Sequence, residues 1–317
     1  LLGSLATASA RDEQNPEVRS HRTRRMLLAI QRGFVSTLPW SPLAFAMAIT
    51  TSLIPGASWG EAVLPCLLTG LVLAVTGWVM DAVFKPQLAS GPVEQNPPEG
   101  SWASVLPLLG LLSILILSVA GLHLITGIRA VGLVIVVVPI MATLWIGIQA
   151  NGERTLATIG TRSVSYLTQD LPQYRGELVL LMMAGFIGTL GSELLVPVLQ
   201  TTGLGLTQIP GWLVLVSLVW LIPLTGQIGM NPILSVSLFA PLLPDPATLG
   251  VSAAALVTAI TAGWALGGAS SPFTATTLLV GSFGGVSATH VGLKWNGVYT
   301  IVCGVILSGW VAYLAIG

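Results

Sequence analysis

Long uncharged apolar stretches, separated by short polar segments, make up most of this 317-residue chain. A helix needs about 20 apolar residues to cross the hydrocarbon core of a bilayer, and in lipid each span must satisfy its own backbone hydrogen bonds. The pattern therefore predicts an all-α, polytopic membrane protein. We expect crossings over residues 26–55, 61–84, 102–124, 131–149, 176–199, 248–284 and 295–316.

Two of these crossings contain a motif that interrupts a helix. Residues 37–42 read TLPWSP, and residues 267–272 read GGASSP. Proline lacks a backbone donor and glycine weakens a helix, so both motifs predict broken helices. Backbone left unpaired at membrane depth persists only where protein or a water-filled cavity covers it, and both breaks therefore predict ligand sites.

A third interruption lies between two apolar arms, residues 212–225 and 233–243, each shorter than a bilayer crossing. The segment between them, residues 226–232, reads GQIGMNP. Two short arms around such a tip favour a re-entrant hairpin over about 211–243, which enters the membrane and returns to its own side. The alternative is one kinked helix that crosses the bilayer.

Charged residues form 8% of the chain, and twelve basic side chains balance twelve acidic ones, which argues against nucleic acid as a partner. Their distribution predicts the topology, because the arginine-rich segment 11–25 is expected in the cytoplasm. A polar linker at 85–101 is expected to join two halves of the chain. Residues 152–175 mix arginines with apolar residues, which indicates either a helix on the cytoplasmic membrane surface or a solvated loop.

Hydroxyl and amide side chains occur at all three interruptions. A helix that begins at membrane depth attracts an anion to its N-terminus, whereas freed carbonyls beside hydroxyl oxygens suit a small cation such as sodium. Serine and threonine in membrane helices also bond to their own backbone or to a neighbouring helix, and that interpretation stays open for each of them. The candidate substrate- or ion-binding residues are Ser36, Thr37, Ser41, Asn231, Ser270, Ser271 and Thr274.

Few ionisable side chains occur within the expected crossings. Glu193 is a candidate for proton coupling if its position lies inside the membrane, and otherwise it meets external water. Arg32 and Asp81 lie near expected cytoplasmic ends, where long side chains reach the interface. No Ser/His pair, paired aspartates, metal-ligand spacing or nucleotide-binding loop appears in the sequence. We therefore expect no catalytic residues, no resident metal and no cofactor, apart from sodium as a coupling ion.

Two segments resemble the second half of the ion transporter superfamily, which includes divalent anion/sodium symporters and arsenite permeases. They are residues 229–243 (GMNPILSVSLFAPLL) and 262–276 (AGWALGGASSPFTAT). In that superfamily a Ser-Asn-Thr hairpin tip precedes an unwound helix, and here only Asn231 matches the triplet. Residues 32–42 (RGFVSTLPWSP) are similar to the broken helix of the inverted first half, and Leu1 to Ala10 to the end of its hairpin. The resemblance thus implies a chain truncated at its N-terminus.

The resemblance implies inverted repeats: residues 1–84 as the remainder of the first, 85–101 as the linker, and 102–317 as the second. It implies a secondary transporter of a small anion, such as an organic acid, driven by sodium or protons through alternating access. A sodium/proton antiporter is the alternative, ahead of a channel or an intramembrane enzyme. The expected location is a prokaryotic plasma (inner) membrane, with membrane lipid as a partner and a homodimer as the assembly.

Overall fold

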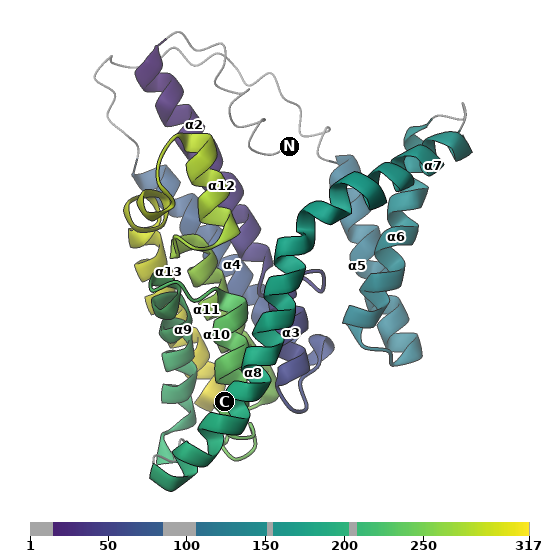
Figure 1. Ribbon diagram of the computed structural model, residues 1–317. Coiled ribbons are helices and arrows are strands. Elements are labelled where there is room, and N and C mark those ends of the chain that lie inside the picture. The colour runs from purple at the N-terminus through teal and green to yellow at the C-terminus, as the bar shows by residue number, and fades with distance from the viewer. Residues whose placement is uncertain (1–14, 85–105, 151–154, 203–207, 317) are drawn as a thin grey trace. The chain divides into compact units, whose positions relative to one another are not determined.

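The computed structural model of the protein describes residues 15–84, 106–150, 155–202 and 208–316. Every regular element within those ranges is a helix (Figure 1). Five helical segments there are long and apolar enough to cross a membrane: Trp59–Val83, Leu106–Thr126, Gly132–Gln149, Ala253–Gly284 and Gly297–Ile316. The structure thus confirms the coarse prediction of an all-helical, polytopic membrane protein.

The chain divides into two compact units, of which the smaller comprises residues 95–184. Within it, α5 (Leu106–Thr126) packs against α6 (Ala130–Gln149), and α6 packs against α7 (Thr155–Ser165). A π-helical turn and a 3-10 turn then lead into α8 (Arg175–Thr202), which passes from this unit into the larger one. Residues 155–174 are therefore helical, as the interpretation of this segment as a surface helix requires.

The larger unit comprises residues 1–94 and 185–317. Three of its helices precede the predicted linker: α2 (Pro16–Thr37), α3 (Phe45–Leu53) and α4 (Trp59–Val83). After the later part of α8 come α9 (Gly211–Gln227), α10 (Pro232–Phe239), α11 (Ala253–Ser270), α12 (Ala275–Gly284) and α13 (Gly297–Ile316). The compact unit joins both predicted repeats, because α4 packs against α11 and α13.

Helix α11 forms the centre of the larger unit and contacts α9, α4, α13, α3 and α2. Its residues from Ala255 to Ser270 are all buried. Small residues permit this close packing: a Cβ added to Gly263 would meet the backbone oxygen of Leu218 at 2.6 Å. Close approach of backbones at glycine is a common way to pack membrane helices without a hydrophobic driving force.

The start of α11 differs from the prediction, which placed it at about residue 248. The helix begins at Ala253, where the Ser252 hydroxyl accepts a hydrogen bond of 3.1 Å from the N–H of Ala255. Before it, the Asp245 carboxylate accepts from Ala247 N–H at 3.0 Å and holds a turn. Ser252 therefore marks the start of the helix, because serine is a preferred N-cap residue.

The helix pairs α2–α3 and α11–α12 run in opposite directions through the larger unit (Figure 1). Consequently α2 packs against α12, and α11 packs against α3. The interruption in each helix pair lies in the region where the two pairs pack against each other. This arrangement places the two predicted breaks inside one compact unit.

Candidate functional site

The two helix interruptions are built in the same way. Between α2 and α3, Ser41 N–H donates to the Thr37 carbonyl, and the Ser41 hydroxyl accepts from Leu43 N–H at 3.3 Å. Between α11 and α12, Ser271 N–H donates to the Gly267 carbonyl, and its hydroxyl accepts from Phe273 N–H at 3.2 Å. A proline follows each serine. Both turns thus share a Ser-Pro core that stops one helix and starts the next.

The second interruption gathers many oxygen atoms. The carbonyl of Gly268 accepts from the Thr276 hydroxyl at 2.5 Å and from the Thr274 hydroxyl at 3.4 Å. The carbonyl of Ser271 accepts from the Thr277 hydroxyl at 2.6 Å and from that of Thr274 at 3.0 Å. These threonine hydroxyls therefore pair the carbonyls of Gly268 and Ser271 within the protein.

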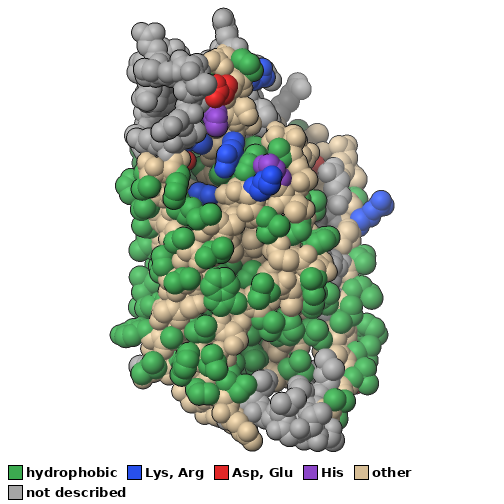
Figure 2. All heavy atoms as spheres, turned by 90° about the vertical axis from the view of Figure 1, so that its left-hand side faces the viewer, with side chains coloured by type: hydrophobic (Ala, Val, Ile, Leu, Met, Phe, Trp, Pro, Cys, Tyr) green, Lys and Arg blue, Asp and Glu red, His purple; other side chains and the backbone are tan. Residues whose placement is uncertain are grey.

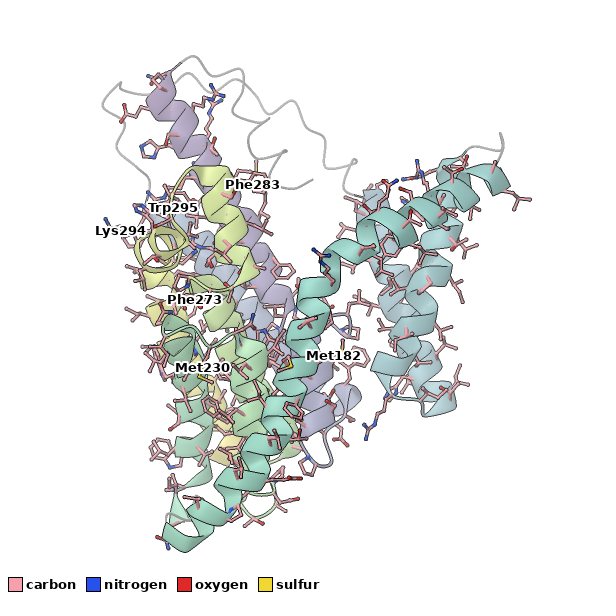
Figure 3. The ribbon with its side chains drawn as sticks, in the orientation of Figure 1. Met182, Met230, Phe273, Phe283, Lys294 and Trp295 are labelled. Carbon is pink, nitrogen blue, oxygen red and sulfur yellow. The ribbon has the colours of Figure 1, made fainter. Side chains whose placement is uncertain are left out.

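The turn between α9 and α10 packs against this interruption. The buried Ser271 hydroxyl donates to the Gly226 carbonyl at 2.6 Å, and Gln227 Nε2 donates to the Ser270 hydroxyl at 3.4 Å. Gly226 allows the approach, because a Cβ there would lie 3.0 Å from Ser271 Cβ. Met230 in the turn and Phe273 in the interruption both lie toward the middle of the larger unit (Figure 3).

The remaining predicted site residues have local roles. The hydroxyls of Ser36 and Thr37 donate to carbonyls of their own helix, each at 2.7 Å. This is the alternative in which serine and threonine in a membrane helix bond to their own backbone. The Asn231 side chain accepts from Ile233 N–H at 3.0 Å and caps α10. Glu193 lies on α8 with an exposed side chain. Of the predicted residues, the structure thus brings Ser270, Ser271 and Thr274 together beside the α9–α10 turn.

A buried polar network connects α2 to the end of α11. Gln31 Nε2 donates to the carbonyls of Gly268 and Ala269 at 3.5 and 3.4 Å. Its Oε1 accepts from Asn296 Nδ2 at 2.9 Å, and Asn296 Oδ1 accepts from Arg32 Nε at 3.1 Å. Gln31 and Asn296 are both almost completely buried. The network therefore links Gln31, which precedes the first helix interruption, to backbone carbonyls at the second interruption.

Arg32, expected near a cytoplasmic helix end, has a side chain that is mostly buried within the larger unit. Only 9% of it is exposed, and its guanidinium lies 4.7 Å from the centre of the Tyr299 ring. Asn296 and the Trp295 carbonyl accept its hydrogen bonds. Its partners lie 263 and 264 residues away in the sequence, so the local pattern does not indicate these contacts.

Sequence reasoning missed Gln31, Asn296, Gln227, Thr276 and Thr277. Gln31 and Arg32 form a polar pair inside the apolar run 26–38, and that pair was an available signal. Within the described residues no group of three or more His, Cys, Asp or Glu side chains is arranged to hold a metal ion. The oxygen atoms of the second interruption come from carbonyls and hydroxyls, a set that suits a small hard cation more than a transition metal.

No protein-family model matches this chain, and a search of curated proteins finds no match.

Proposed function

We propose that this protein is a secondary active transporter that moves a small anion across a membrane by alternating access. The observation that carries the proposal is the matched pair of Ser-Pro interruptions, at Ser41 and Ser271, in helices that run in opposite directions within one unit. Interrupted helices related by inversion are a common construction of substrate sites in transporters. Under this proposal α2–α4 and α11–α13 are corresponding parts of two inverted repeats.

In this account the helix N-termini at the two breaks supply the attraction for the anion. Both α3 and α12 begin without a side-chain cap. Unpaired N–H groups and the helix dipole favour negative charge at such an end. The α9–α10 turn is the tip of a re-entrant hairpin, and its contact with Ser271 closes one side of the site. Asn231 then lies at the tip, where its Oδ1 caps α10 and its amide NH2 group is the proposed donor to the substrate.

The coupling ion in this account is sodium or a proton. The carbonyls of Gly268 and Ser271 with the hydroxyls around them are the proposed sodium ligands, since each is a hard oxygen donor. The same observation favours a second function, sodium/proton antiport, in which a cation is the only cargo and Glu193 carries the proton. A prokaryotic plasma (inner) membrane and a homodimer remain predictions from the sequence resemblance.

Uptake by proteoliposomes tests the proposal. Purified protein is reconstituted, and dicarboxylates, sulfate, arsenite and small monocarboxylates are offered under a sodium gradient or a proton gradient imposed separately. We expect saturable uptake of one class of anion under one gradient. Sodium/proton exchange without uptake of any anion would replace the proposal by the antiporter. Flux that does not saturate and follows the anion gradient alone would indicate a channel.

A further inference from the structure

A basic cavity lies at one end of the larger unit, apart from the helix interruptions. It has a volume of about 260 Å³ and lies between α2, the end of α4 and the turn before α13. Its cationic lining residues are Arg24, Arg25, Arg32 and Lys294. Asp81 is the one carboxylate among the described residues that line it, so cations outnumber carboxylates by three.

The single carboxylate is already paired. Arg25 donates to Asp81 at 3.0 Å through Nε and at 2.6 Å through its terminal nitrogen, a two-point contact. This hydrogen bond raises the pKa of Arg25 above its ordinary value. Arg24 lies with its guanidinium carbon 5.2 Å from the centre of the Trp295 ring. Arg24 and Lys294 therefore present positive charge to the cavity beside an ion pair that is internally neutral.

The position of the cavity relative to the candidate membrane spans indicates what occupies it. Met80 and Asp81 lie in the last turn of the span Trp59–Val83, and Phe84 directly follows it. Val298 lies at the start of the span Gly297–Ile316. Cationic and histidine side chains gather toward one end of this face, above a broad surface with many apolar side chains (Figure 2). Lys294 and Trp295 lie toward that same end of the unit (Figure 3). The cavity is thus at the level that lipid headgroups take around a membrane protein.

The rim of the cavity is apolar and exposed. Phe84 is 68% exposed and Val298 is 58% exposed, and both line the cavity. A ligand that is anionic at one end and apolar at the other matches cations inside and apolar side chains at the mouth. Basic pockets between membrane helices bind phosphate-bearing headgroups for this reason.

We propose that this cavity binds the phosphate of an anionic phospholipid, with Arg24 and Lys294 as its cationic ligands and the acyl chains against Phe84 and Val298. Phosphate is the shared chemistry of a lipid headgroup and of a soluble phosphate. The apolar rim and the adjoining spans favour the lipid. The proposal does not depend on the transported substrate.

Binding of phosphatidylglycerol to the full protein in detergent, followed by native mass spectrometry, tests the proposal. Phosphatidylcholine serves as the zwitterionic lipid, and inorganic phosphate and glycerol phosphate serve as soluble probes. We expect saturable binding of phosphatidylglycerol that Arg24→Gln/Lys294→Gln weakens about 30-fold, because each cation near an anionic surface contributes about 1 kcal/mol. The control variant Arg162→Gln/Arg175→Gln removes the same amount of charge from two exposed arginines, one in α7 and one at the start of α8. It is expected to bind phosphatidylglycerol normally.

Three results would overturn the proposal. One is equal binding by the two double variants. Another is equal binding of phosphatidylcholine. The third is binding of inorganic phosphate or glycerol phosphate that is as tight as that of phosphatidylglycerol and is weakened by Arg24→Gln/Lys294→Gln. That result would assign the cavity to a free anion. Arg24→Lys keeps the charge and is expected to retain binding. Size-exclusion chromatography of each variant shows whether a loss of binding comes from misfolding instead of from the lost charge.

Discussion

Ser41 and Ser271 hold equivalent places in two helix interruptions that run in opposite directions. Each hydroxyl accepts a hydrogen bond from the N–H two residues later, at 3.3 Å for Ser41 and 3.2 Å for Ser271. They differ in one contact, since the Ser271 hydroxyl also donates to the Gly226 carbonyl at 2.6 Å. The second interruption is therefore tied to the α9–α10 turn.

This difference predicts unequal effects of two alanine substitutions. Ser271→Ala leaves a buried carbonyl at Gly226 without its partner and is expected to reduce the free energy of unfolding by about 1–3 kcal/mol. Ser41→Ala removes only the local turn bond and is expected to cost about 1 kcal/mol or less. Unfolding in detergent, followed by tryptophan fluorescence, measures both. Ser217→Ala, which removes an exposed bond within α9, is the control. Equal losses at Ser41 and Ser271 would show that the contact with Gly226 contributes nothing.

Gly226→Ala tests the same contact from the other side. The added Cβ would lie 3.0 Å from Ser271 Cβ and 3.3 Å from its hydroxyl oxygen, so the Ser271 side chain must shift by a few tenths of an ångström. We expect a loss of about 1–3 kcal/mol from this overpacking, together with reduced uptake. Gly309→Ala in α13 meets open space and is expected to be neutral or to stabilise by up to about 1 kcal/mol. If Gly226→Ala resembled Gly309→Ala in stability and uptake, the close approach of Gly226 to Ser271 would contribute to neither.

Asn231→Asp separates helix capping from substrate binding. Aspartate caps a helix as well as asparagine does, so stability is expected to change little. A negative charge at the hairpin tip repels an anion, and we expect anion uptake to fall roughly tenfold or more, equivalent to at least about 1.4 kcal/mol. Asn15→Asp makes the same change at the N-cap of α2 and is expected to leave uptake intact. Unchanged uptake by Asn231→Asp would remove this residue from the proposed anion site, whereas stimulated sodium exchange would favour the antiporter.

Gln31 and Asn296 are expected to act as one unit. Asn296→Ala leaves the buried Gln31 Oε1 without its partner, and Gln31→Ala leaves Asn296 Nδ2 with only the longer bond of 3.4 Å to the Val291 carbonyl. Each is expected to cost about 1–3 kcal/mol. In a double-mutant cycle the pair is expected to show a coupling energy of about 0.5–3 kcal/mol. Ser308 lies twelve residues beyond Asn296 in α13, roughly 18 Å along the helix. The cycle of Asn296 with Ser308 is therefore expected to be additive, and an additive result for Gln31 with Asn296 would contradict the network.

The positions of the helix interruptions were predictable from the sequence, because proline and glycine act on the backbone locally. Both breaks and the short arms around residues 228–231 follow from that local chemistry. The start of α11 was placed about five residues early, since apolar character continues upstream of the Ser252 cap.

The contacts of the site were less predictable, because they join residues far apart in sequence. Gln31 and Asn296 are separated by 265 positions, and nothing in either local pattern indicates the other. The contacts of Arg32 could not be predicted for the same reason, because its partners are at the far end of the chain. Ser271 was predicted as a ligand residue, but its bond to Gly226 depends on how the α9–α10 turn packs.

The most direct test of the central claim is whether an imposed ion gradient drives an anion against its own gradient. Proteoliposomes that contain the protein are given a sodium or a proton gradient, and accumulation of radiolabelled anion is followed before and after an ionophore collapses that gradient. The account predicts accumulation above equilibrium that the ionophore abolishes. Movement of the anion only down its own gradient, unaffected by the ionophore, would contradict it.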